Sequence, residues 1–190
     1  EGFTKNRISD FDLVCKIIKK NIFLIEQKTS FIFKEVNIVL NNFESSLVTF
    51  SGFKKLNGSQ LLKENITYIL NSLKSKIDEI EKDKKILHIF NSKYLLDNKK
   101  VENIPIGLFG NFYCHELSFF LINTNDFKNL RSIFNNCNLK INKIISKNFI
   151  DGVNLINKNL NLDTFFEIKI NRQNSQIIFF ENSALKFIED

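Results

Sequence analysis

The sequence predicts an α+β fold, on three observations. Residues 60–82 place apolar side chains at helical spacing along one side, with Lys, Glu and Asp opposite. Residues 86–96 and 112–122 are apolar runs that fit buried strands. Residues 164–188 contain three more apolar runs separated by polar turns, as in a three-stranded meander. The order of helices and strands between residues 41 and 122 predicts a small α+β unit there.

The chain is expected to open with a helix over residues 10–27. Ser9 and, three residues later, Asp12 give the pattern of a capping box at its start. Apolar residues recur along one side of this helix, which favours packing in a core; they are Phe11, Val14, Ile18, Ile22 and Ile25.

Two strands are expected next, over residues 34–40 and 47–53. Ser51 and Gly52 indicate a bulge or an edge position in the second of them. The sequence Asn57-Gly58-Ser59 predicts a turn followed by the cap of the long helix. That helix should cover one face of the sheet formed by the later strands.

The region after the long helix has the most unusual composition of the chain. A polar break at residues 91–93 interrupts the first apolar run. Pro105, the only proline, then fixes one φ angle, and Gly107 and Gly110 can adopt φ values that other residues avoid. Together they predict a shaped loop and not a flexible one.

The last third of the chain is expected to form two helices and four strands. Thr124 or Asn125 would cap the first helix, a strand follows over residues 141–145, and a short helix over 149–160 leads to the meander. The apolar side of the first helix comprises Phe127, Leu130, Ile133, Phe134 and Cys137.

The overall composition is that of a globular protein. A chain of 190 residues that is 43% hydrophobic can bury one sizeable core or two small ones. The net charge of +6 would favour anionic partners, but lysines spread evenly among glutamates and asparagines indicate the codon bias of an AT-rich genome. Three cysteines without a pairing pattern predict reduced thiols in a cytoplasmic protein, packed as small apolar side chains. A chain that starts at Glu1 and has no methionine is expected to be a piece of a longer protein.

Several motifs occur in an order that resembles the bacterial cell-division protein family FtsA. They are ILHIF at 86–90, YLLDN at 94–98, the loop from Pro105 to Gly110, the strand over 112–122 and the helix over 127–134. The resemblance implies a fragment of the actin-like fold with the extra α+β subdomain of that family.

The same resemblance implies a division of the chain into parts. Residues 1–40 would be part of the first actin-like lobe, where Gly2, Thr4 and Lys5 stand in for the family's glycine-lysine turn. The remaining parts would be the extra subdomain at 41–122, the return into the first lobe at 123–162, and the first strands of an incomplete second lobe at 163–190.

An actin-like ATPase would hold phosphate at the first turn of the meander, with the pattern Asp-x-Gly-x-Gly-Thr. The matching segment, residues 167–175, reads Glu-Ile-Lys-Ile-Asn-Arg-Gln-Asn-Ser and contains no glycine. Lys169 and Arg172 could neutralise phosphate, but long side chains would block the main-chain N–H groups. No cofactor is therefore expected in this fragment, and ATP with Mg²⁺ in the full-length protein is implied by the resemblance alone.

Other local patterns give no catalytic, cofactor-binding or metal-binding residue. Cys114, His115 and Glu116 invite a metal hypothesis, but adjacent strand residues point to opposite faces and no metal-binding spacing accompanies them. His88 and His115 are interpreted as ordinary strand residues. Neither a Gly-x-Ser-x-Gly motif nor a Walker-type loop occurs.

The basic residues raise two binding hypotheses. Lys16, Lys19 and Lys20 beside the first helix's apolar face would suit a membrane surface. The two apolar strands that follow need a cover, which favours packing in a core. Lysines among phenylalanines would suit single-stranded nucleic acid, yet their spacing follows core periodicity, and no nucleic acid is expected as a partner.

The resemblance implies a scaffold at the inner face of the cytoplasmic membrane. Such a protein would tether FtsZ filaments through a C-terminal membrane helix outside this sequence, associate with itself, and recruit later division proteins through the extra subdomain. The loop from Pro105 to Gly110 and an exposed edge of the strands carrying Tyr94 and Phe112 are the expected contact surfaces. The alternatives are another actin-like ATPase, such as a pilus-assembly protein or a chaperone-like nucleotide switch, and a basic nucleic-acid-binding module.

Overall fold

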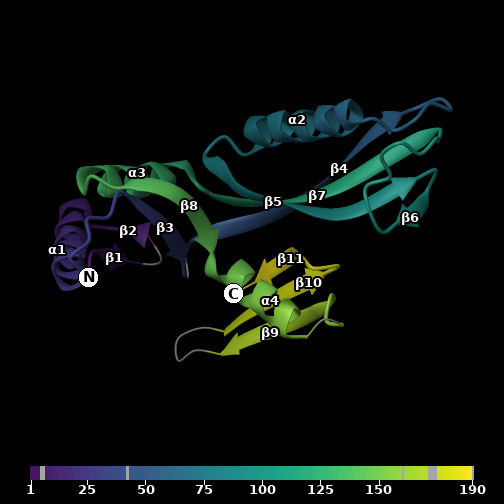
Figure 1. Ribbon diagram of the computed structural model, residues 1–190. Coiled ribbons are helices and arrows are strands. Elements are labelled where there is room, and N and C mark those ends of the chain that lie inside the picture. The colour runs from purple at the N-terminus through teal and green to yellow at the C-terminus, as the bar shows by residue number, and fades with distance from the viewer. Residues whose placement is uncertain (5–6, 42, 160, 171–174, 190) are drawn as a thin grey trace.

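The computed structural model describes residues 1–4, 7–41, 43–159, 161–170 and 175–189. Within this part of the chain the fold is mixed α+β, as the sequence predicts (Figure 1). None of the helices found there has the length and apolar character needed to cross a membrane. In chain order the elements are β1 (Phe3–Thr4), β2 (Arg7–Ile8), α1 (Phe11–Thr29), β3 (Glu35–Leu40), β4 (Ser45–Lys55), α2 (Lys63–Ile80), β5 (Lys84–Leu96), β6 (Lys99–Val101), β7 (Phe112–Asn123), α3 (Thr124–Asn136), β8 (Lys140–Ser146), α4 (Lys147–Lys158), β9 (Phe165–Ile170), β10 (Ser175–Glu181) and β11 (Ala184–Glu189).

The longest strands form an antiparallel sheet in the order β4-β7-β5-β6. Helix α2 lies along one face of this sheet (Figure 1) and buries Ile69, Leu73 and Ile77 against it, which confirms the predicted cover. Gly52 permits the close approach, because a Cβ atom there would lie 2.5 Å from Cγ2 of Ile69. β4 is an edge strand, as Ser51 and Gly52 indicated, but its pairing with β7 contains no bulge.

The opposite face of the sheet belongs to a second core. Phe120 and Ile122 of β7 pack there with the parallel pair β3 and β8 and with the three-stranded sheet β9-β10-β11. Phe180 of β10 and Leu185 of β11 are fully buried in the same core. The described ranges therefore contain two cores, which was one of the two arrangements expected from the size of the chain.

Three helices are capped by residues other than those the sequence patterns indicated, and for α2 the cap is Leu62 and not Ser59. Asp10, and not Ser9, caps α1, because its carboxylate accepts a hydrogen bond from the N–H of Leu13 at 2.9 Å. Asn123 caps α3, one residue before Thr124, and its side-chain oxygen accepts two N–H groups of the first turn. In α1 and α3 a short polar side chain beside the expected cap has the better geometry.

Two expectations about the strands need correction. The polar break at residues 91–93 is a bulge inside the single strand β5, where the pairing with β7 shifts register. The strands that carry Tyr94 and Phe112 do not form an exposed edge. β7 is paired with β4 on one side and β5 on the other, and Tyr94 pairs with Val101 of β6.

Helix α1 packs into the protein along one side, most closely in its first half. Val14 is buried, Ile18 is half-buried, and the helix lies against α3. In the second half, Phe23, Leu24 and Ile25 are all exposed. Of the five residues predicted on the apolar side, four are buried or half-buried, namely Phe11, Val14, Ile18 and Ile22, so the core prediction is wrong for Ile25 alone.

Candidate functional site

The loop from Pro105 to Gly110 is held in place by main-chain hydrogen bonds, which confirms the prediction of a shaped loop. Four such bonds tie it to residues 58–61, and the shortest runs from the N–H of Gly107 to the carbonyl of Leu61 at 2.8 Å. Gly107 has a φ of 84°, a value that side-chain-bearing residues rarely adopt. Because residues 58–61 pair with the loop, α2 begins at Lys63 and not at the predicted residue 60.

Asp97, in the turn between β5 and β6, anchors the end of the same loop. Its Oδ1 atom accepts hydrogen bonds from the N–H groups of Asn111 and Phe112, both at 2.8 Å. The N–H of Asp97 in turn donates to the Phe112 carbonyl at 2.8 Å. The loop is therefore fixed on both sides by groups outside it.

Large apolar side chains are exposed on this fixed loop and beside it. Phe109 is 69% exposed and Phe53 is 62% exposed, although the Phe53 ring stacks on Phe112 with a centroid distance of 5.6 Å. Exposed apolar groups that gather in one place mark interaction sites more often than scattered ones do. We call this group the tip surface, and its members are Phe53, Leu62, Ile106, Leu108 and Phe109.

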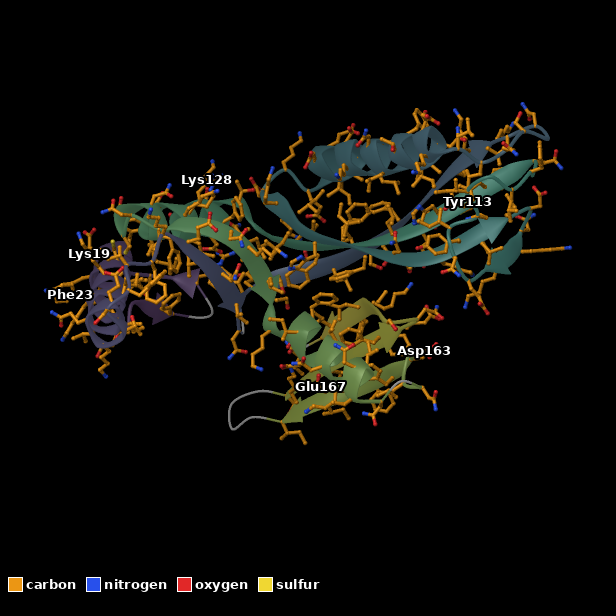
Figure 2. The ribbon with its side chains drawn as sticks, in the orientation of Figure 1. Lys19, Phe23, Tyr113, Lys128, Asp163 and Glu167 are labelled. Atoms are coloured by element: carbon orange, nitrogen blue, oxygen red, sulfur yellow. The ribbon has the colours of Figure 1, made fainter. Side chains whose placement is uncertain are left out.

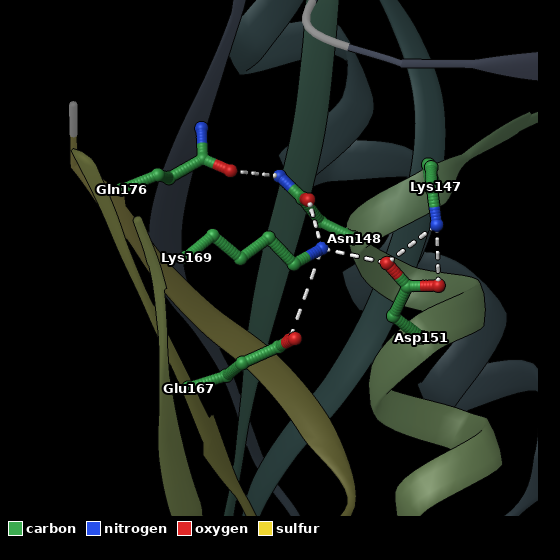
Figure 3. A network of polar contacts seen from close by, with 6 residues as sticks. All are labelled: Lys147, Asn148, Asp151, Glu167, Lys169 and Gln176. Atoms are coloured by element: carbon green, nitrogen blue, oxygen red, sulfur yellow. Dashed lines mark hydrogen bonds and ion pairs between the residues drawn. The ribbon is translucent and has the colours of Figure 1, made fainter. Parts of the chain in front are cut away.

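A second candidate site is a polar network that joins α4 to β9 (Figure 3). The Lys169 ammonium donates to the Asp151 carboxylate at 2.7 Å and to Oδ1 of Asn148 at 2.9 Å. Lys147 donates to both oxygens of Asp151, at 2.8 and 2.9 Å. Glu167 lies on the other side of Lys169, with an N–O separation of 3.8 Å. Two cations therefore share two carboxylates at this junction.

The network extends to a third element and is electrostatically balanced. The Asn148 amide donates to Oε1 of Gln176 on β10 at 2.8 Å. Burial would raise the pKa of Asp151, but the hydrogen bonds from Lys147 and Lys169 hold that pKa below its ordinary value. Asp151 is therefore a stable anion, and the network can clamp α4 onto β9 and β10.

The described part of this network does not fit ATP with Mg²⁺. Lys169, one of the two cations considered for phosphate, is only 22% exposed, and Asp151 and Glu167 balance its charge. A Mg²⁺ ion would need carboxylates that are free to face it and its waters. Arg172 and the rest of the turn at residues 171–174 lie outside the described residues, as does Lys5 in the first glycine-lysine turn.

The metal hypothesis for Cys114, His115 and Glu116 is not supported by the positions of these residues. His115 is buried on the α2 side, with Nε2 3.1 Å from Oδ1 of Asn91, and burial lowers its pKa to about 4. Glu116 lies on the other side of β7, where it accepts hydrogen bonds from Ser92 at 2.6 Å and from Lys186 at 3.1 Å. Across the described ranges, no three potential ligands gather in a way that could hold a metal ion.

The second histidine lies in an apolar environment. Burial lowers the pKa of His88, and its Nε2 atom is 3.4 Å from the N–H of Ser146. Its ring contacts Phe90, Phe120 and Phe149. All three cysteines are free thiols that are partly buried, namely Cys15, Cys114 and Cys137.

Sequence reasoning identified the loop of the tip surface but missed the polar network. Lys147 and Asp151 form an i,i+4 ion pair, but α4 begins at Lys147 and not at the predicted residue 149, so the prediction left Lys147 outside the helix. Their contact with Lys169 depends on how α4 lies against β9, and the sequence contains no local signal for it.

Comparison with known proteins gives a likeness in structure and none in sequence. No protein family model matches the sequence, and no curated protein matches it. A solved structure described as a PilM-PilN type IV pilus biogenesis complex matches 99% of this chain, with a TM-score of 0.61 and 8% sequence identity. This chain spans 50% of the matched chain's length. At this identity the likeness concerns the fold alone, and the fold is coarsely actin-like.

Proposed function

We propose that this chain is part of an actin-like scaffold protein that binds partner proteins through the tip surface. The observation that carries this proposal is the combination of five exposed apolar side chains with a loop fixed by main-chain bonds and by Asp97. A fixed loop loses little conformational entropy on binding, and aromatic anchors are typical of the centre of protein interfaces.

The finer role that we propose is the cell-division role implied by the FtsA resemblance. The full protein would tether FtsZ filaments at the inner face of the cytoplasmic membrane, and its unit at residues 41–122, which carries the tip surface, would recruit later division proteins. This role does not depend on a nucleotide at the α4–β9 junction. There the charge of Lys169 is already balanced by Asp151 and is not free for a phosphate.

A pilus-assembly role is the second candidate. It is favoured by the structural likeness to a chain of the PilM-PilN complex, which shows that this type of fold can occur in an assembly with another protein. Both candidates require a protein partner and differ in its identity.

The test measures the affinity of this chain for the cytoplasmic segments of later division proteins, for FtsZ polymers and for a PilN-type segment. The variant is Ile106→Gln with Phe109→Gln, and the matched control is Phe23→Gln with Ile32→Gln at the other end of the molecule. Removing two anchors should weaken the division-protein complex at least about tenfold, while the control leaves it unchanged.

Three results would contradict these proposals in different ways. Equal affinities for the tip variant and the unchanged chain would exclude the tip surface as the binding site. Binding of the PilN-type segment alone would replace the division role with the pilus role. The absence of binding to any of these proteins would remove the scaffold proposal for this chain.

A further inference from the structure

The end of α1 and the residues after it expose consecutive apolar side chains. Phe23 is 57% exposed and Ile32 is 76% exposed, although both are large and apolar. Figure 2 shows Phe23 and Lys19 projecting from the end of the molecule that carries α1. We call this group the α1-end surface, and its members are Phe23, Leu24, Ile25, Phe31 and Ile32.

The residues after the helix are held close to it. Ser30 ends α1 in the left-handed conformation, with a φ of 53°. The N–H of Phe31 then donates to the Glu26 carbonyl at 3.3 Å, and the N–H of Phe33 donates to the Glu26 side chain at 2.9 Å. Phe31 and Ile32 are therefore presented beside the last turn of α1 and not on a free tail.

Lysines alternate with these apolar residues on the helix. Residues 16–32 contain four lysines and one glutamate, and that glutamate is Glu26, which is half-buried and bonded to the main chain. Lys19 lies four residues before Phe23, and Lys20 and Lys28 lie four residues to either side of Leu24. In the described part of the chain none of these lysines forms an ion pair.

We propose that the α1-end surface binds the surface of an anionic lipid bilayer. Phe23, Leu24 and Ile32 would enter the boundary between headgroups and acyl chains, and the flexible lysine side chains would extend to the lipid phosphates. A protein partner fits less well, because lysine is depleted in the centres of protein interfaces. A second copy of the chain would bring the two lysine clusters together.

The test is co-sedimentation of this chain with vesicles of phosphatidylcholine, with and without phosphatidylglycerol. Binding should require phosphatidylglycerol and should weaken as salt concentration rises. Phe23→Gln with Ile32→Gln should lower the partition coefficient at least about tenfold. Lys20→Gln and Lys28→Gln should each lower it roughly fivefold. All four positions are exposed, so circular dichroism should show unchanged folding.

The matched control is the tip variant, Ile106→Gln with Phe109→Gln, which removes the same two residue types at the opposite end. It should bind vesicles like the unchanged chain, even where it has lost its protein partner, so this proposal and the proposed function can fail separately. Equal loss of lipid binding in both variants, or equal binding to vesicles without phosphatidylglycerol, would overturn the proposal. So would a dimer that depends on Phe23 and Ile32 in a chain that binds no vesicles.

Discussion

Gly152 gives a test of how α4 is attached to the meander. The glycine is buried within α4, and a Cβ atom there would lie closer than 3.0 Å to three ring carbons of Phe180. Phe180 cannot easily move, because it is fully buried and stacks on Phe165 at a centroid distance of 5.0 Å. In an exposed helix, Gly→Ala would stabilise by about 1 kcal/mol. Here overpacking of about 1–3 kcal/mol opposes that gain, and we expect Gly152→Ala to lose stability overall.

Thermal unfolding followed by circular dichroism measures this effect. A chain of this size should lose roughly 2–4 °C in Tm for each kcal/mol lost. Asn154→Ala at an exposed position of α4 is the control and should raise Tm slightly. Combining Gly152→Ala with Phe180→Leu should cost less than the sum of the two single changes, because the smaller side chain makes room. A rise in Tm for Gly152→Ala alone would refute the close packing of α4 on β10.

Three further predictions concern titration, the loop and the polar network. Burial lowers the pKa of His115 to about 4 in the folded chain, so between pH 6.5 and pH 4 the unfolded chain takes up a proton that the folded chain excludes. The free energy of unfolding, measured by urea titration, should therefore fall by about 2 kcal/mol between pH 7 and pH 5. His115→Gln should make the free energy of unfolding depend less on pH over this range. Asp97→Ala removes the acceptor of two N–H groups and should cost about 1–2 kcal/mol, with faster amide exchange in residues 105–112 as the specific readout; unchanged exchange would show that the loop is fixed without Asp97. Lys169→Met leaves Asp151 and Glu167 without one cation and should cost about 1–3 kcal/mol in the same titrations, whereas an unchanged stability would show that the network does not clamp α4 to β9.

The features that the sequence predicted are those that local patterns determine. The apolar stripe of α2, the shaped loop at Pro105 to Gly110 and the meander each depend on residues that are close in the chain. Errors arose where distant residues decide the outcome. The position of β7 between β4 and β5 made the expected exposed edge at Phe112 wrong, and the contact of Lys169 with Asp151 could not be seen from either segment. The exposed apolar residues at the end of α1 were missed because Phe23 and Leu24 lie outside the stripe from which the core prediction was made.

The two proposed surfaces lie at opposite ends of the molecule, and this separation affects how they can work together (Figure 1). Strand β5 has 13 residues, which at about 3.3 Å per residue separates the tip from the base of the sheet by roughly 40 Å. Charges on a lipid surface are screened over about 8–10 Å at physiological ionic strength, so a bilayer at α1 exerts little force on a partner at Phe109. The two binding events should therefore be independent, as a tether requires. A protein partner bound at the tip should leave the salt dependence of vesicle binding unchanged, whereas a change would mean that the two surfaces lie closer together in the bound state than they do here.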